Sequence, residues 1–201
     1  MRTLVLASNN PGKLREIRAV LAGLPWKVIA QAELAIPEAD EPYESFLENA
    51  LAKARHAAAA SGEAALADDS GLCVPSLGSE PGVHSAYYAG REGSREERDA
   101  RNNALILENV AGKDRRAYYA CVMVLVRDAS DSSPIVAEAR WEGEIAAAPR
   151  GHNGFGYDPL FHVPALGKTA AELDPETKNR ISHRGQALRC LLELLRHARL
   201  D

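Results

Sequence analysis

Four short polar segments of this 201-residue chain combine residue types that could bind a phosphorylated ligand. The first, SNNPGK at residues 8–13, precedes a predicted helix, where backbone amides can bind an anion and Lys13 adds a positive charge. It is not a Walker A loop, because Ala7 and Leu14 stand where that motif requires glycine and serine or threonine. A plain turn with a solvated lysine explains this segment equally well.

The second segment contains adjacent carboxylates, in the sequence DDSG at residues 68–71 after a short apolar run. Because side chains alternate along a strand, Asp68 and Asp69 should point in different directions. One carboxylate could then bind Mg²⁺ while the other orients a ligand or a water molecule. An Asx turn before a glycine is the structural alternative. The acidic stretch 38–48 is typical of a solvated face, although one of its carboxylates could complete a metal site with Asp69.

The third segment is the glycine-rich loop GHNGFGYD at residues 151–158. Its glycines permit close backbone approach, and Phe155 and Tyr157 offer ring faces to a flat ligand. Asp158 could accept hydrogen bonds from a heterocycle. The alternative is a mobile loop whose aromatic side chains return to the core.

The fourth segment, KNRISHRG at residues 178–185, places cations around the start of the last predicted helix. Cations and a helix dipole favour phosphate, although Ser182 could act only as a helix cap. Lys53 is a further candidate phosphate contact, because an interior-facing lysine one turn from Asn49 would be unusual unless it met an anion. Together, these segments predict a site for a magnesium-bound nucleoside polyphosphate.

The apolar pattern predicts the elements that must position these segments. Helices are expected over residues 13–24, 45–60, 94–109 and 182–199, with strands over 2–7, 26–30, 64–67, 115–127 and 135–145. Turn residues between the last two strands indicate an antiparallel hairpin. The alternation of helices and strands predicts one compact α/β unit with a mixed sheet.

The composition narrows the class of partner. The formal net charge of −4 argues against a nucleic-acid partner, since such proteins usually carry a broad basic surface. No apolar run reaches about 18 residues, and the N-terminus turns polar too early for a signal peptide, so neither a membrane span nor secretion is expected. The three cysteines show no CxxC pair, which fits buried small residues in a reducing cytoplasm.

The motifs occur in an order that resembles the inosine triphosphate pyrophosphatase family. They are SNNPGK at 8–13, FLENALAKA at 46–54, DDSGL at 68–72, FGYDPLF at 155–161 and KNRISHRGQAL at 178–188. The resemblance runs essentially from end to end. It implies an elongated mixed sheet flanked by helices, in a single catalytic domain over 1–201 with the nucleotide in a cleft between two lobes. It also implies a homodimer, Mg²⁺ dependence and hydrolysis of ITP, dITP or XTP to the monophosphate and pyrophosphate.

The resemblance assigns roles to matching positions. Asp69 matches the general base and a metal ligand, and Glu41 the second metal ligand, with Glu44 as a rival. Whether Asp68 or Asp69 accepts the proton stays open. The expected substrate contacts are Ser8, Asn9, Asn10, Pro11, Gly12, Lys13, Lys53, Ser70, Phe155, Gly156, Tyr157, Asp158, Lys178, His183 and Arg184.

Base selection should depend on hydrogen-bond donors. A donor such as Arg184, or a backbone amide near His183, would donate a hydrogen bond to the 6-oxo group of hypoxanthine or xanthine and would not pair with the 6-amino donor of adenine. Two alternative functions remain. A Maf-type nucleotide pyrophosphatase typically carries arginines where this chain has Gly12 and Lys13. A nucleotide sensor that does not hydrolyse would not need the intact aspartate pair.

Overall fold

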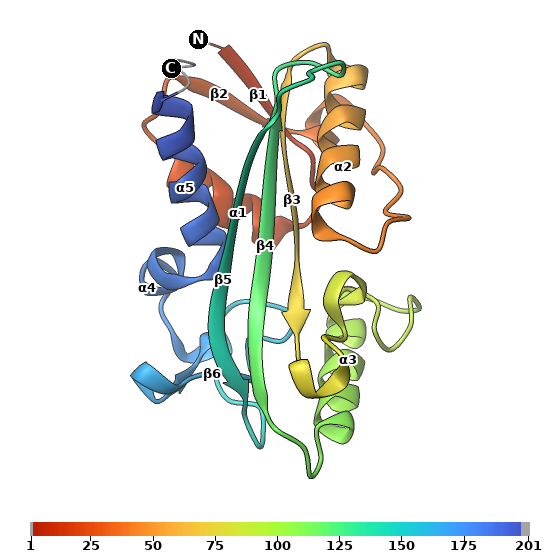
Figure 1. The fold of residues 1–201 in the computed structure, drawn as a ribbon, viewed down its shortest axis with the longest axis vertical. Helices are drawn as coiled ribbons and strands as arrows, with labels where there is room; N and C mark the ends of the chain where they lie inside the picture. Colours follow the sequence, from red (N-terminus) through yellow and green to blue (C-terminus); the bar gives the residue numbers. More distant parts are fainter. Residues whose placement is uncertain (1, 198–201) are drawn as a thin grey trace. The chain divides into compact units, whose positions relative to one another are not determined.

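The computed structural model describes residues 2–197 and contains a seven-stranded mixed sheet in the order β2-β1-β3-β4-β5-β6-β7 (Figure 1). The strands are β1 (Arg2–Leu6), β2 (Trp26–Ala30), β3 (Ala64–Cys73), β4 (Arg116–Val126), β5 (Ile135–Ile145), β6 (Phe161–Val163) and β7 (Lys168–Thr169). The α-helices within this range are α1 (Pro11–Leu21), α2 (Phe46–Ser61), α3 (Arg95–Asn109), α4 (Pro175–Ile181) and α5 (His183–His197). β1 pairs in parallel with β2 and β3, whereas β6 pairs antiparallel with β5 and β7. The predicted α/β class with a mixed sheet is confirmed.

The chain divides into two compact units. Unit 1 comprises the described parts of 1–69, 121–139 and 184–201, and unit 2 comprises 70–120 and 140–183. The three long strands β3, β4 and β5 each contribute residues to both units. The expected single catalytic domain and its cleft stay predictions. No helix in the described part of the chain is long and apolar enough to cross a membrane.

Unit 1 has a separate apolar layer on each face of its strands. Alternate strand residues face opposite ways, so Leu66 packs with α1 and α5, whereas Ala65 and Ala67 pack with α2. Figure 1 shows α2 on the opposite side of these strands from α1 and α5. Small residues at the α2 contact let this helix lie close to the sheet; they are Ala50, Ala54, Ala57 and Ala58.

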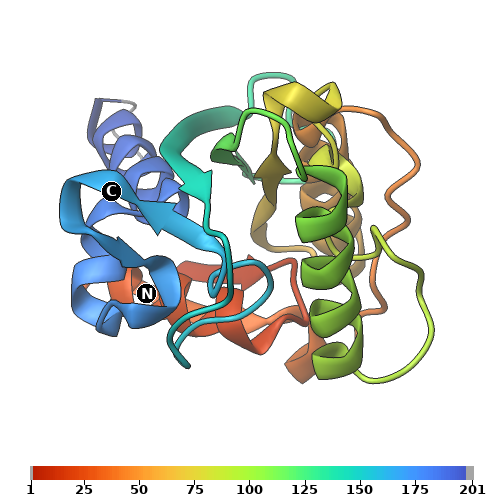
Figure 2. The ribbon, with the colours of Figure 1, turned by 90° about the horizontal axis from the view of Figure 1, so that it is seen from below.

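Unit 2 has its own core, to which α3 contributes Ile106 and β4 contributes Tyr119. Figure 2 shows α3 on one side of this unit and β6 on the other. The start of α3 confirms the predicted capping box. Ser94 Oγ accepts a hydrogen bond from the Glu97 amide at 3.2 Å, and Glu97 Oε2 accepts one from the Ser94 amide at 2.7 Å.

Several elements differ from their predicted bounds by one to three residues at an end, for example α1, which spans Pro11–Leu21 instead of 13–24. Two further differences concern the segments with candidate functional residues. The strand expected to stop at residue 67 continues through the aspartates to Cys73, so the alternative of an Asx turn is wrong. The predicted helix over 182–199 begins instead at His183 and follows a separate helix, α4. Ser182 separates the two helices with an extended backbone, φ −68 and ψ 159. Residues 198 and 199 lie outside the described range.

Candidate active site

The segment 8–13 joins β1 to α1 and is shaped by its own hydrogen bonds. Asn10 caps the helix, because its Oδ1 accepts hydrogen bonds from the amides of Gly12 at 2.9 Å and Lys13 at 3.2 Å. Ser8 Oγ accepts a hydrogen bond from the Asn10 amide at 3.2 Å. The first turn of α1 therefore starts at a defined position, and the Lys13 side chain forms an ion pair with Asp68.

The other two residues of this segment are also held in place. Asn9 Oδ1 accepts a hydrogen bond from Gln31 Nε2 at 3.2 Å. Pro11 begins α1, where the missing amide hydrogen of proline costs nothing. Anion binding by this loop stays a prediction, since Asn10 already caps two of its amides.

Asp68 and Asp69 are neighbours in the interior of β3, so their side chains lie on opposite faces of the sheet. Asp68 shares its face with Leu66 and the helices α1 and α5, and Asp69 faces α2. Both carboxylates are buried, with 2% of Asp68 and 6% of Asp69 exposed. The prediction that the two side chains point in different directions is correct. The charged residues that contact the two aspartates therefore form two groups, one on each face of the sheet.

The Asp68 carboxylate is surrounded by donors. It forms ion pairs with Lys13 and with Arg184 Nε, the latter at 3.1 Å, and Cys121 Sγ donates to it at 3.1 Å. Arg184 also forms an ion pair with Glu16. Burial opposes ionisation of Asp68, but Arg184 and Lys13 outweigh that cost and hold its pKa well below the ordinary value. Such a carboxylate is a weak proton acceptor, and it anchors two helices to the strand.

The Asp69 carboxylate has a different environment. Lys53 Nζ donates to Asp69 Oδ1 at 2.8 Å and to Glu41 Oε1 at 2.7 Å. Asp69 Oδ2 is buried without a hydrogen-bond partner in the described part of the chain. Burial raises the pKa of Asp69 against the opposing charge of Lys53, and Glu41 adds to the rise. Asp69 is therefore the better proton acceptor of the pair.

Asn49 positions the acidic segment that carries Glu41. Asn49 lies one turn before Lys53 on α2 and makes two hydrogen bonds with the backbone of Tyr43. Asn49 Nδ2 donates to the Tyr43 carbonyl at 3.0 Å, and the Tyr43 amide donates to Asn49 Oδ1 at 3.1 Å. Of the two rival carboxylates, Glu41 is therefore the one that meets Lys53.

The residues around Asp69 fit a divalent cation. The described residues contain no group of three or more histidine, cysteine, aspartate or glutamate side chains that could hold a metal by itself. Mg²⁺, however, is usually bound by one or two carboxylates together with water and substrate phosphates. Glu41 and Asp69 already share one cation, Lys53, and Asp69 Oδ2 is an acceptor without a partner.

In unit 2, Asp158 of the loop 155–158 and Lys178 form a further cluster of charged side chains. Lys178 Nζ donates to Asp158 Oδ2 at 2.6 Å, and the Phe155 amide donates to the same oxygen at 2.8 Å. The Lys178 ammonium lies 5.0 Å from the centre of the Phe155 ring, and the guanidinium of Arg95 lies 4.8 Å from it. Arg95 was not predicted, although the capping box placed it in the first turn of α3.

Other predicted contacts in unit 2 have structural partners. His183 is 4% exposed and stacks on Tyr119 at 4.5 Å, with an angle of 11° between the rings. Tyr157 returns to the core, as the structural alternative for this loop predicted, and its hydroxyl donates to the Ser85 carbonyl at 2.9 Å. Ser70 is half-buried in β3. Contacts of these residues with substrate stay predictions.

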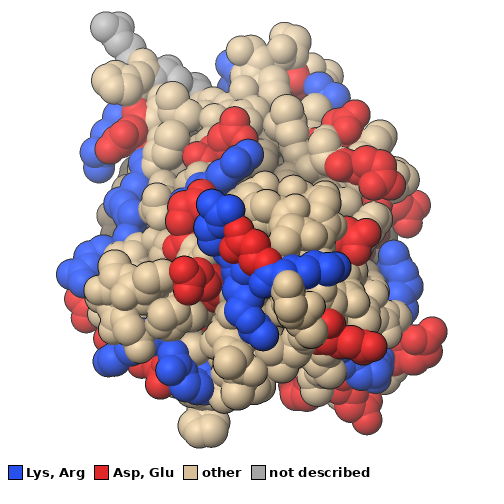
Figure 3. Space-filling model, turned by 60° about the horizontal axis from the view of Figure 1, so that its bottom comes forward, with Lys and Arg blue, Asp and Glu red and all other residues tan. Residues whose placement is uncertain are grey.

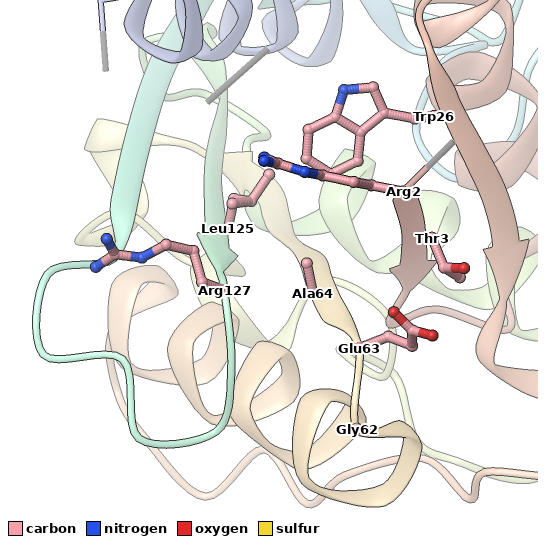
Figure 4. Close-up of a pocket in the computed structure, with 8 residues that line it drawn as sticks. All are labelled: Arg2, Thr3, Trp26, Gly62, Glu63, Ala64, Leu125 and Arg127. Atoms are coloured by element: carbon pink, nitrogen blue, oxygen red, sulfur yellow. The ribbon is translucent and has the colours of Figure 1, made fainter. Parts of the chain in front are cut away.

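A cavity of about 400 Å³ lies in another part of unit 1 (Figure 4). Its lining includes Arg2 and Thr3 at the start of β1, Ala64 at the start of β3 and Arg127 after β4. None of its lining residues belongs to the predicted site. In unit 1, the candidate functional residues are therefore the charged side chains around Asp68 and Asp69.

Comparisons with known proteins cover nearly the whole chain. Residues 4–194 match the model of the Ham1 family. A dITP/XTP pyrophosphatase of Burkholderia pseudomallei is 60% identical over 193 residues, which cover 96% of this chain and 92% of that protein. Another from Ralstonia nicotianae is 58% identical over 197 residues, covering 98% of both. A solved HAM1 protein from Coxiella burnetii has a TM-score of 0.90 at 48% identity and covers 98% of this chain and 100% of that one.

Proposed function

This chain belongs to the Ham1 family, and on that basis we propose that it hydrolyses dITP, XTP and ITP to the nucleoside monophosphate and pyrophosphate. Family membership confirms the resemblance found in the motifs. The observation that carries the proposal is the sequence identity of 60% and 58%, over nearly the full length of the chain, to two proteins named dITP/XTP pyrophosphatase. The activity would remove deaminated purines from the nucleotide pool before polymerases incorporate them.

The proposed chemistry uses the residues of unit 1 on the Asp69 face. Asp69 Oδ2, which has no hydrogen-bond partner among residues 2–197, accepts a proton from the attacking water. That water attacks the α-phosphorus, and the bond to the bridging oxygen breaks to release pyrophosphate. Mg²⁺ held by Glu41 and Asp69 would stabilise negative charge on the phosphates. Lys53 supplies a fixed positive charge beside both carboxylates.

Asp68 has a different proposed role from Asp69. Its oxygens are committed to Lys13, Arg184 and Cys121, and its pKa is depressed rather than raised. We assign it to orienting Lys13, which adds positive charge for the triphosphate. Donation from Arg184 to the base stays a prediction, because that guanidinium forms ion pairs with Asp68 and Glu16.

Base recognition is assigned to the loop residues of unit 2. The carboxylate of Asp158 and the ammonium of Lys178 form an adjacent acceptor and donor, 2.6 Å apart. A 6-oxopurine presents a donor at N1 and an acceptor at O6, whereas adenine presents the opposite pattern. A buried polar pair that adenine leaves unsatisfied could discriminate by about 10⁴-fold. Phe155 offers its ring for stacking against the base, next to the backbone of Gly156.

The remaining proposals concern partners and location. We expect one catalytic domain over 1–201 and a homodimer, as the motifs imply. A nucleic-acid partner is not expected, since acidic and basic side chains are interspersed on the face shown in Figure 3. The three cysteines are free thiols, which fits a reducing cytoplasm.

A substrate screen tests the proposed function. The purified protein is given dITP, XTP, ITP, GTP, ATP, dTTP and UTP, and pyrophosphate and phosphate are measured separately, with Mg²⁺ or with EDTA. Pyrophosphate release from dITP, XTP and ITP that requires Mg²⁺ supports the proposal. Preference for dTTP or UTP would indicate a Maf-type enzyme instead, and binding without pyrophosphate release would indicate a sensor.

A further inference from the structure

Two side chains of α3 bind both polar groups of Gly156. The Gly156 amide donates to Asp99 Oδ2 at 2.8 Å, and Asn103 Nδ2 donates to the Gly156 carbonyl at 2.9 Å. Asp99 and Asn103 are four residues apart and therefore lie on the same face of the helix. Each contact joins residues more than fifty positions apart in the sequence, 57 for Asp99 and 53 for Asn103.

The Asn103 side chain is oriented for this contact. Its Nδ2 also donates to the Asp99 carbonyl at 2.7 Å, so one amide group serves two carbonyl oxygens. Rotating the amide would place Oδ1 against both acceptors. In the present orientation, Asn103 Oδ1 is buried with no hydrogen-bond partner in the described range. An unsatisfied buried acceptor costs free energy, so this orientation is favoured because Nδ2 donates to both the Asp99 and the Gly156 carbonyl.

The segment that α3 holds has little intrinsic order. Gly151, Gly154 and Gly156 all have positive φ, the last at 63°, and glycine loses more conformational freedom on folding than any other residue. Gly156 directly follows Phe155, whose amide is bound to Asp158 Oδ2 at 2.8 Å. Fixing the Gly156 peptide therefore restricts the residues on both of its sides.

A third residue of the same helix reaches the Phe155 ring. Arg95 lies four residues before Asp99, with Nε 3.9 Å from Asp99 Oδ2, and its guanidinium lies 4.8 Å from the ring centre. Residues 95, 99 and 103 thus form one stripe along α3. This stripe contacts the ring of Phe155 and the peptide that follows it.

We propose that Asp99 and Asn103 are positioning residues for purine binding, and that they act by fixing the Phe155–Gly156 backbone. The inference rests on the proposed function, which assigns Phe155 and Asp158 to the base. The proposed function assigns the phosphate chemistry to other residues, Asp69, Lys53 and Glu41. Loss of Asp99 or Asn103 should weaken nucleotide binding and leave the rate of the bound complex nearly unchanged.

The first test replaces the donor of Asn103. Asn103→Asp keeps the shape but presents oxygen to the Gly156 carbonyl, and Asn103→Ala removes the group without adding charge. We expect KM for dITP to rise about tenfold in each, with kcat within about twofold of wild type. Asp99→Ala should act likewise, and Asp99→Asn, which keeps an acceptor, should restore most of the affinity.

The matched control is Asn109→Asp at the end of the same helix. Asn109 Nδ2 donates to the Tyr88 hydroxyl at 2.9 Å, so the substitution also removes a side-chain donor. Thermal unfolding is measured for every variant. If Asn103 has a purely structural role, its variants should lose stability as the Asn109→Asp control does and keep the wild-type KM. That result for Asn103→Asp and Asn103→Ala would overturn the proposal.

A double-mutant cycle with Phe155→Ala identifies the route of the effect. If Asn103 acts through Phe155, the double variant should raise KM little more than Phe155→Ala alone. Additive effects would overturn the proposal while leaving the proposed function intact. If Phe155→Ala leaves KM unchanged, or wild type hydrolyses no non-standard purine nucleotide, the assigned base site and this inference both fail.

Discussion

Lys53 donates a hydrogen bond of 2.8 Å to Oδ1 of Asp69, while Oδ2 of the same carboxylate is buried with no hydrogen-bond partner in the described structure. One oxygen is thereby neutralised and the other stays available as an acceptor. Lys53 also contacts Glu41 at 2.7 Å, so its ammonium lies beside both carboxylates that we assign to Mg²⁺. This arrangement is the basis for the first two predictions.

Replacing Asp69 by asparagine should abolish most of the activity. The change keeps the shape but removes the charge that accepts the proton, and loss of a general base typically lowers kcat by roughly 100-fold to 10,000-fold. Pyrophosphate release from dITP at saturating Mg²⁺ measures the effect. Asp40→Asn, in the exposed acidic segment, is the control and should be fully active. Near-native turnover of Asp69→Asn would show that another group accepts the proton.

Removing the Lys53 ammonium should make the thermal stability of the protein depend more strongly on Mg²⁺. Lys53→Met leaves Glu41 and Asp69 without their shared cation, and breaking a buried ion pair costs about 3–5 kcal/mol, less here because Glu41 is partly exposed. Millimolar Mg²⁺ should then raise the Tm of Lys53→Met more than that of wild type. Lys27→Met, at an exposed lysine, should behave like wild type. Equal rises in Tm would contradict a metal site at these carboxylates.

Stability should depend on pH through Asp131. Its Oδ2 accepts hydrogen bonds from the Arg127 amide at 3.0 Å and Nε at 2.9 Å, and its Oδ1 accepts one from the Ser133 amide at 2.9 Å. These bonds hold the pKa of Asp131 below its ordinary value, and the bond from the Arg127 side chain has the largest effect.

A carboxylate with a depressed folded pKa stabilises the protein above its unfolded pKa, roughly 3.9, and this contribution is lost as pH falls toward the folded pKa. Asp131→Asn should therefore lower the free energy of unfolding at pH 7 by about 1–3 kcal/mol. In urea titrations the difference from wild type should begin to shrink as pH falls from about 5 to about 3, because the unfolded carboxylate is protonated in this range. A difference that does not change with pH would refute a role of the charge.

Gly71 should tolerate no side chain. A Cβ there would overlap the Gly82 carbonyl oxygen and lie 2.5 Å from Ser85 Oγ. Since backbone must move to relieve the overlap, Gly71→Ala should destabilise by about 3 kcal/mol or more. Gly112→Ala is the matched control, because Gly112 has a φ of +71° but open space around it, and its cost should be about 1–2 kcal/mol. Equal midpoints of thermal unfolding for the two variants would refute this packing argument.

Local patterns were sufficient for most elements of the fold. The strands predicted over 26–30 and 135–145 have the bounds of β2 and β5, and the capping box at Ser94 was correct. The prediction failed at residue 67, where aspartates and a glycine are typical of a turn. The strand continues there because Lys13, Arg184 and Lys53 neutralise the two buried carboxylates.

The sequence by itself determined which residue types carry the chemistry and which family they belong to, because motifs and periodicity are local properties of the chain. Only the tertiary structure decided which cation meets which carboxylate. Arg184 contacts Asp68, which is 116 residues away in the sequence, and the Gly156 amide contacts Asp99 of α3, which is 57 residues away. These contacts depend on how strands and helices pack, since burial and distance set the pKa values that distinguish Asp69 from Asp68.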